Sequence, residues 1–258
     1  GADVLRLWVS SVDYSADVPI GAGILRQLAD VYRKVRNTSR YLLGNLHDFN
    51  PASDAVPVAE LPLLDRWMLQ RTAEVMDEIT EAFESYEFFR FFQLLQNFCV
   101  TDLSNFYLDI AKDRLYVSAP ADRRRRSCQT VMSLIIERLA GLIAPVLCHM
   151  AEDIWQNLPY KVEETSIFNR GWPTVPADWR DPSLSDPMQQ LRDLRAAVNK
   201  VLEDCRSRQE LGASLEASIR LEAHRPELQT ALSWLNENGD VEVDGLRDWL
   251  LVSQLQIG

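Results

Sequence analysis

The stretch from residue 86 to residue 116, YEFFRFFQLLQNFCVTDLSNFYLDIAKDRLY, holds six of the nine phenylalanines in the chain. Its apolar side chains recur at helical spacing, no Pro or Gly interrupts them, and its first half is apolar on almost every side. This pattern predicts one long helix that other helices surround, because an all-apolar helix must be buried. We therefore expect a mainly α protein, a helical bundle built around this rod.

The composition is typical of an ordinary globular protein. The 258 residues, 47% hydrophobic and 25% charged, allow one large domain or two with an ample core. No apolar run reaches the roughly 20 residues that a bilayer crossing needs, and the N-terminus does not resemble a signal peptide. We expect a cytoplasmic protein without membrane contacts. The four cysteines (Cys99, Cys128, Cys148 and Cys205) are far apart and form no C-x-x-C pair, so we interpret them as reduced core thiols.

The net charge restricts the partners. With 27 basic and 38 acidic residues the chain carries −11, which argues against indiscriminate binding of polyanions such as DNA. The acids concentrate in a predicted helix over residues 63–86, whose acidic side we expect to face water. Any nucleic-acid site must therefore be a local basic surface.

Two local basic surfaces stand out. A predicted helix over residues 24–46 has a single acid, Asp30, among the basic residues of its stretch from 24 to 41. Arg33, Arg36 and Arg40 are three and four residues apart, so they share one face of that helix. The second surface is the basic end of the rod, at Lys112 and beyond. Either surface could instead be a solvated face without a partner.

Four consecutive arginines, Arg123 to Arg126, open another predicted helix, which is bent or broken before Pro145. The helix dipole disfavours cations in a first turn, so this run indicates an anionic partner. The alternative is a solvated run beside a loop.

The periodicity changes after a loop rich in Pro and Trp, over residues 160–186. A helix beginning at Asp186 and Pro187 is followed by an alternating strand over residues 215–223. Pro226 opens another helix to about Asn238, and a second strand covers residues 251–257. We expect three parts: a short N-terminal segment (1–20), a helical domain (21–180) and a small α+β module (181–258).

No catalytic constellation is present in the sequence. The phosphate-loop, dinucleotide, H-E-x-x-H and G-x-S-x-G motifs are missing, and the three histidines lie in different segments without Cys or His partners at ligand spacing. We predict neither catalytic residues nor a metal site. From the residues alone, the chain is a binding module.

The ordered segments GADVLRLW, RKVRNTSRYLLGNL, LDRW, NFCVTDLSNFYLD with KDRLY, and APVLCHMAEDIWQNLP resemble bacterial-type isoleucyl-tRNA synthetases, a class I family. The resemblance covers essentially the whole chain. It implies the tail of a stem-contact region, a helical anticodon-binding domain and a junction module, in that order. The H-I-G-H and K-M-S-K-S signatures, the editing domain and the zinc module of the family are absent. The chain should therefore be inactive alone, whereas the full-length enzyme would use ATP with Mg and a zinc ion.

The resemblance implies that the partner is the anticodon loop of an isoleucine tRNA, bound by a monomer. The matching positions are Arg36 and Arg40 on the first helix, with Lys112 and Arg114 on the rod. We expect their cationic groups to neutralise phosphates and the arginines to form forked hydrogen bonds to base edges. Tyr116 or Tyr41 would stack on a splayed base. The remaining basic and polar candidates would contact the RNA backbone: Arg33, Lys34, Asn37 and Arg123 to Arg126.

Two other functions stay open. A helical protein-interaction scaffold would have basic faces that are merely solvated. A self-contained enzyme would need a set of reactive residues that the sequence does not offer.

Overall fold

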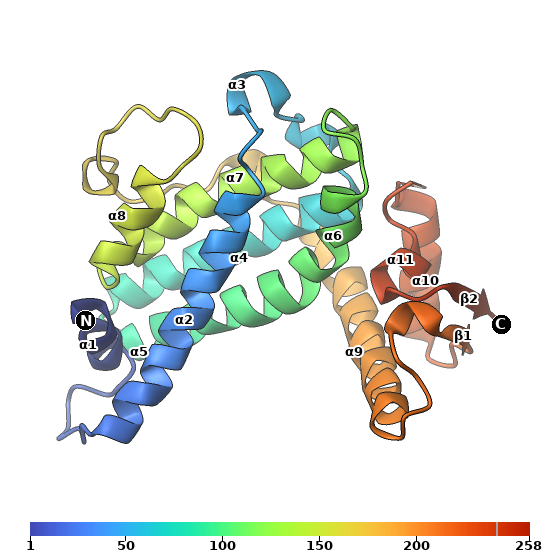
Figure 1. The fold of residues 1–258 in the computed structure, drawn as a ribbon, viewed down its shortest axis with the longest axis horizontal. Coiled ribbons are helices and arrows are strands. Elements are labelled where there is room, and N and C mark those ends of the chain that lie inside the picture. Colours follow the sequence, from blue (N-terminus) through green and yellow to red (C-terminus); the bar gives the residue numbers. More distant parts are fainter. Residues whose placement is uncertain (241) are drawn as a thin grey trace.

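Helices make up most of the chain, and most of them lie in one bundle (Figure 1). The computed structural model describes residues 1–240 and 242–258. The helical elements of the bundle are α1 (Ala2–Ser10), α2 (Ala22–Gly44), α3 (Pro51–Asp54), η1 (Val58–Glu60), α4 (Leu63–Glu84), α5 (Phe88–Asn97), η2 (Phe98–Tyr107), α6 (Leu108–Tyr116), α7 (Arg123–Ile143) and α8 (Cys148–Gln156). The predicted mainly α fold is confirmed.

The rod predicted over residues 86–116 is continuous, but it is not one regular α-helix. The ten residues of η2 form a π-helix between α5 and α6. The Ser104 hydroxyl donates to the Cys99 carbonyl, five residues back, at 2.8 Å, and the Thr38 and Ser104 hydroxyls are 3.0 Å apart. Such π-helical segments inside α-helices are frequently found at functional sites. The prediction of a single α-helix is therefore wrong in its centre.

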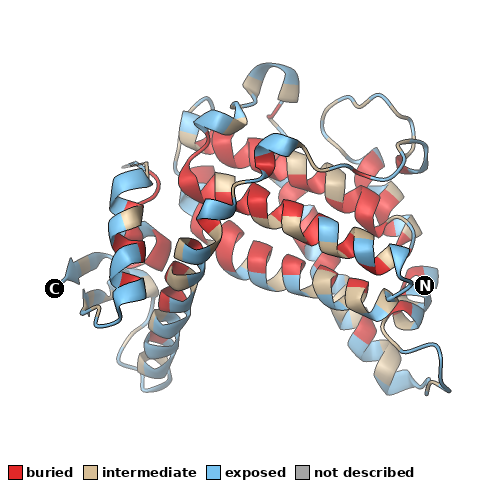
Figure 2. Cartoon of the chain, turned by 180° about the vertical axis from the view of Figure 1, so that it is seen from behind, coloured by how far each residue is buried: buried red, intermediate tan, exposed pale blue. Residues whose placement is uncertain are grey.

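The core lies where α4, α7 and the rod pack together, as the buried residues in Figure 2 show. Large apolar side chains of the rod, such as Phe91, Phe98 and Leu103, are almost fully buried. Burial extends around much of α4 and α7, which lie between other helices. The expectation of a water-facing acidic side on α4 is wrong for Asp65, which is completely buried.

The Pro- and Trp-rich segment after α8 contains three short 3-10 turns, η3 (Ile167–Asn169), η4 (Ala177–Trp179) and η5 (Pro182–Leu184). Trp179 is buried, with Arg138 of α7 over its ring at 5.1 Å. Arg180 donates to both oxygens of Asp77 on α4. The segment therefore packs along the bundle.

The C-terminal module consists of α9 (Ser185–Ser207), η6 (Ser214–Glu216), β1 (Ser218–Leu221), α10 (Pro226–Asn238), α11 (Leu246–Leu250) and β2 (Gln254–Ile257). The two strands pair in parallel, with Ser218 opposite Gln254 and Leu221 opposite Ile257. The sequence predicted α9, α10 and both strands, but it did not predict α11. The helix α9 begins at Ser185, with Leu184 rather than Asp186 at its cap position. The division between residues 180 and 181 stays a prediction.

Carboxylates from both ends of the chain cap helices of the bundle. The Asp244 carboxylate accepts hydrogen bonds from the Leu63 and Leu64 amides of α4, at 2.8 and 3.2 Å. Asp3 accepts from the His149 and Met150 amides of α8 in the same way. The residues at the cap positions of α4 and α8 make no side-chain cap. The flanking segments therefore satisfy helix ends that the bundle leaves open.

Candidate nucleic-acid interface

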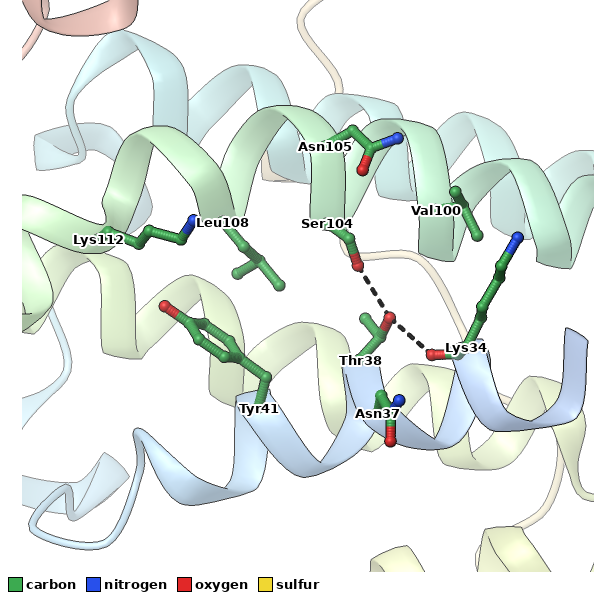
Figure 3. A pocket seen from close by; sticks show the side chains of 9 residues that line it. All are labelled: Lys34, Asn37, Thr38, Tyr41, Val100, Ser104, Asn105, Leu108 and Lys112. Atoms are coloured by element: carbon green, nitrogen blue, oxygen red, sulfur yellow. Dashed lines mark hydrogen bonds between the residues drawn. The ribbon is translucent and has the colours of Figure 1, made fainter. Parts of the chain in front are cut away.

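A groove runs between α2 and the rod (Figure 3), with a volume of about 350 Å³. Polar residues from both helices line it around the apolar side chains of Val100 and Leu108. The lining residues are Lys34, Asn37, Thr38, Tyr41, Val100, Ser104, Asn105, Leu108 and Lys112. Of the residues predicted to bind RNA, the groove contains Asn37 and Lys112, together with the secondary candidates Lys34 and Tyr41.

The closest polar contact across the groove joins two small side chains. The Thr38 hydroxyl lies 3.0 Å from that of Ser104 and 3.0 Å from the Lys34 carbonyl of its own helix. Because neither side chain is long, α2 and η2 approach closely at this point. The longer side chains of Lys34 and Lys112 extend at opposite ends of the groove (Figure 3). The groove thus has a fixed floor and a cation at each end.

The two lysines differ in their surroundings. Lys112 donates to Asp109 at 2.7 Å, and Asp109 also accepts a hydrogen bond from Arg195 of α9. Lys34 is exposed, and no carboxylate of residues 1–240 or 242–258 forms an ion pair with it. An exposed ammonium group without a carboxylate partner is available to an anion.

The three predicted arginines of α2 are exposed, but none of them lines the groove. Arg33 is paired with Asp30, one turn earlier. Arg36 and Arg40 have no ion-pair partner in the part of the chain that the structure describes. They lie on an exposed face of α2 that is separate from the face lining the groove. The arginines that the sequence grouped on one face of α2 therefore lie on a different face from the one that lines the cavity.

The prediction that Arg114 contacts RNA is wrong. Arg114 is only 8% exposed, and its guanidinium donates to both oxygens of Asp65 at 2.9 and 2.7 Å. Opposite charges this close inside a core stabilise each other, and the pKa of Arg114 is raised, although burial alone would lower it. The basic end of the rod thus presents Lys112 and not Arg114.

The arginine run at the start of α7 is likewise held by protein groups. Arg125 donates to both oxygens of Asp48, at 2.6 and 2.9 Å, and Arg126 donates to the Asp48 carbonyl at 2.9 Å. Arg124 pairs with the helix cap Asp122, and Arg123 lies 3.6 Å from Asp240. These contacts remove the need for an anionic partner. The prediction that the run contacts the RNA backbone is wrong for Arg125 and Arg126, which are buried or nearly so.

Two tyrosines lie at the Lys112 end of the groove. Tyr116 is 65% exposed, whereas Tyr41 is half-buried and lines the cavity. Burial, followed by the proximity of Tyr116, raises the pKa of Tyr41, so its hydroxyl stays protonated in neutral solution. A ring in each position could stack on a base that reaches this end.

Three polar lining residues, Thr38, Ser104 and Asn105, were not among the residues predicted to contact RNA. Asn105 precedes Asp109 and Lys112 by four and seven residues, so the sequence alone places these three polar residues on one face of the rod. The π-helical winding that brings Ser104 to Thr38 could not be predicted from the sequence, because it depends on a contact with another helix.

The described residues contain no cluster of His, Cys, Asp and Glu side chains that could hold a metal. Burial raises the pKa of Cys99 and of Cys128 to about 12, which keeps both as thiols rather than the thiolates that zinc binds. Cys148 and Cys205 are only half-buried, so the expectation of four core thiols is wrong for these two.

None of the helices that the structure describes has both the length and the apolar character for crossing a membrane.

Comparison with known proteins identifies related sequences. Residues 65–221 match the family described as the anticodon-binding domain of tRNA ligase. The whole chain is 88% identical to isoleucine–tRNA ligase of Parasynechococcus marenigrum (strain WH8102) and covers 26% of that protein. It is 80% identical to the isoleucine–tRNA ligases of Prochlorococcus marinus (strain MIT 9313) and Synechococcus sp. (strain CC9311), covering 27% of each. The chain thus spans about a quarter of the length of these relatives.

Proposed function

The chain belongs to the family of anticodon-binding domains of tRNA ligases, and on this premise we propose that its groove holds the anticodon loop of an isoleucine tRNA. The main support is the position of unpaired cations. Lys34 lies in the groove, and Arg36 and Arg40 lie on another exposed face of the same helix, in a chain whose net charge is −11. The buried or partnered arginines, such as Arg114 and Arg125, provide no comparable surface.

The groove offers different contacts to the phosphates and to a base. Lys34 and Lys112 at its two ends suit two phosphates of a bent RNA loop, since an ammonium group acts as a point charge. Between them, the side-chain amides of Asn37 and Asn105 can each donate to and accept from a base edge. The apolar side chains of Val100 and Leu108 suit the face of an unstacked base.

Arg36 and Arg40, on another face of α2, contact phosphates of the RNA outside the groove. Arg33 attracts a phosphate less strongly, because it forms an ion pair with Asp30. Tyr116, being exposed, stacks on a base that leaves the groove at the Lys112 end.

The proposal extends to the protein that contains this chain. That protein is an isoleucine–tRNA ligase, a cytoplasmic monomer that attaches isoleucine to its tRNA with ATP and Mg. Among residues 1–240 and 242–258, no cluster of side chains fits Mg or zinc, and the buried cysteines Cys99 and Cys128 are thiols. The contribution of the 258-residue chain to this protein is recognition of the tRNA.

Binding of purified tRNAs to the 258-residue chain tests this function. We expect tighter binding of isoleucine tRNA than of a non-cognate tRNA, with an affinity that falls as salt is added because phosphate contacts release counterions. Equal affinities with little salt dependence would reject the proposal. That result would favour the protein-interaction scaffold with merely solvated basic faces.

A further inference from the structure

Arg195 of α9 lies outside the groove and is only 5% exposed. Its guanidinium donates to three acceptors: the Trp249 carbonyl at 2.7 Å, the Asn105 carbonyl at 2.8 Å and the Asp109 carboxylate at 2.5 Å. The first acceptor belongs to α11 of the C-terminal module, and the other two belong to the rod. One buried side chain therefore connects the module to the rod.

Both acceptors on the rod are connected to the groove. Asn105 lines it directly and belongs to the π-helix η2. Asp109 holds the groove-lining Lys112 through its other oxygen, at 2.7 Å. Arg195 is thus linked to two residues that would meet the RNA: to Asn105 directly, and to Lys112 through Asp109.

The summed charge of Lys112, Asp109 and Arg195 determines how strongly Lys112 attracts a phosphate. A Lys112–Asp109 pair by itself is neutral and offers little attraction to a phosphate. With Arg195 the group carries one net positive charge, and the exposed end of that group is Lys112, whose side chain is 53% exposed. Arg195 itself is too buried to reach RNA.

We propose that Arg195 is a positioning residue for the groove: it neutralises Asp109 and fixes the backbone at Asn105, so that the charge of Lys112 is available to a phosphate. This inference rests on the proposed function. It makes the C-terminal module part of the RNA site through a residue that never touches RNA.

The ionisation of Asp109 agrees with this arrangement. Burial acts to raise the pKa of Asp109, but hydrogen bonds from Lys112 and Arg195 outweigh it, and the pKa is lowered. The carboxylate is therefore charged at neutral pH and needs both cations around it.

The salt dependence of isoleucine tRNA binding tests the proposal on the 258-residue chain. In Arg195→Met we expect the slope of log affinity against log salt to fall by about 0.7 and the affinity to fall about fivefold near 0.1 M salt, as for one lost phosphate contact. Lys112→Ala should give a similar change. The double variant Arg195→Met/Asp109→Asn should regain the wild-type slope, because removing the acid restores the net charge of the group. A purely structural role would not be rescued by removing Asp109.

Arg192→Met is the matched control, since Arg192 lies one turn earlier on α9 and pairs with Asp102, which Arg71 also holds. Its slope should equal that of the wild type. If Arg195→Met does not fold, Arg195→Lys keeps the charge but cannot reach all three acceptors, and a smaller loss of affinity is expected.

A measurement without RNA separates this inference from the proposed function. Titration of the Asp109 carboxyl by NMR should give a higher pKa in Arg195→Met than in the wild type and no change in Arg192→Met. An unchanged Asp109 pKa in Arg195→Met, or a slope that Asp109→Asn does not restore, would overturn the role of Arg195 alone. Absence of salt-dependent binding by the wild-type chain would overturn the proposed function and, with it, this role.

Discussion

The guanidinium of Arg114 donates two hydrogen bonds to the completely buried carboxylate of Asp65, at 2.9 and 2.7 Å. The Tyr107 hydroxyl donates to the same carboxylate at 2.6 Å. This pair links the basic end of the rod to α4 inside the core. Arg114 is thus an example of a cation that protein groups neutralise. Other cations of the chain are exposed and can bind an external anion.

Replacing Arg114 by Met should destabilise the fold. The change leaves the Asp65 carboxylate buried without its cation, which typically costs about 3–5 kcal/mol of unfolding free energy. Urea unfolding measures this cost. Arg208→Met, which breaks an exposed pair with Glu210, is the control and should cost at most about 1 kcal/mol. Equal losses in the two variants would contradict the structural role of Arg114.

Replacing Asp48 by Asn should reduce stability in a pH-dependent way. Hydrogen bonding by Arg125 outweighs burial and holds the pKa of Asp48 well below its ordinary value. The stabilisation is therefore complete above the unfolded-state pKa of about 4 and is lost as the pH falls toward the lower folded-state pKa. We expect a difference between wild type and variant of roughly 2–3 kcal/mol at neutral pH, since hydrogen bonds to a charged group are lost. Urea unfolding at several pH values should show this difference shrinking below about pH 4; a constant difference would be inconsistent with the ion pair.

The double variant Arg36→Ala/Arg40→Ala should leave stability within about 0.5 kcal/mol of the wild type, because both side chains are exposed and unpaired in the described chain. Its tRNA affinity should fall, with a salt slope lower by about 1.4, as expected for two phosphate contacts. The preference for isoleucine tRNA should persist, since phosphate contacts do not read sequence. A lost preference with an unchanged slope would instead assign base recognition to these arginines.

Replacing Asp244 by Ala should loosen the start of α4. The Asp244 carboxylate caps the Leu63 and Leu64 amides, and losing a helix cap costs about 1–2 kcal/mol. Hydrogen exchange at these two amides should accelerate. Asp186→Ala, an exposed change in the first turn of α9, should leave their exchange unaltered. Unchanged exchange in Asp244→Ala would show that another group caps α4.

The apolar periodicity of the sequence was enough to predict the bundle, and Pro226 marked the start of α10 correctly. The fates of Arg114 and Arg125 could not be predicted, because their partners Asp65 and Asp48 lie 49 and 77 residues away along the chain. A run of basic residues looks the same in the sequence whether it faces a phosphate or a buried carboxylate.

The same limit applies to the groove. Helical spacing grouped Arg33, Arg36 and Arg40 correctly on one face of α2, but it did not reveal which face lies against the rod. The π-helix, whose Ser104 meets Thr38, has no Gly or Pro to mark it. The positions of Asn37 and Lys112 in one cavity follow from this packing and not from their spacing in the sequence.

The salt dependence of isoleucine tRNA binding by the double variant Lys34→Ala/Lys112→Ala tests the groove most directly. We expect a slope lower by about 1.4 and an affinity about 10- to 30-fold weaker near 0.1 M salt, because two phosphate contacts are lost. The control Lys161→Ala/Lys200→Ala removes two exposed lysines elsewhere and should match the wild type. If the groove variant also binds with the wild-type slope and affinity, the groove does not hold the anticodon loop.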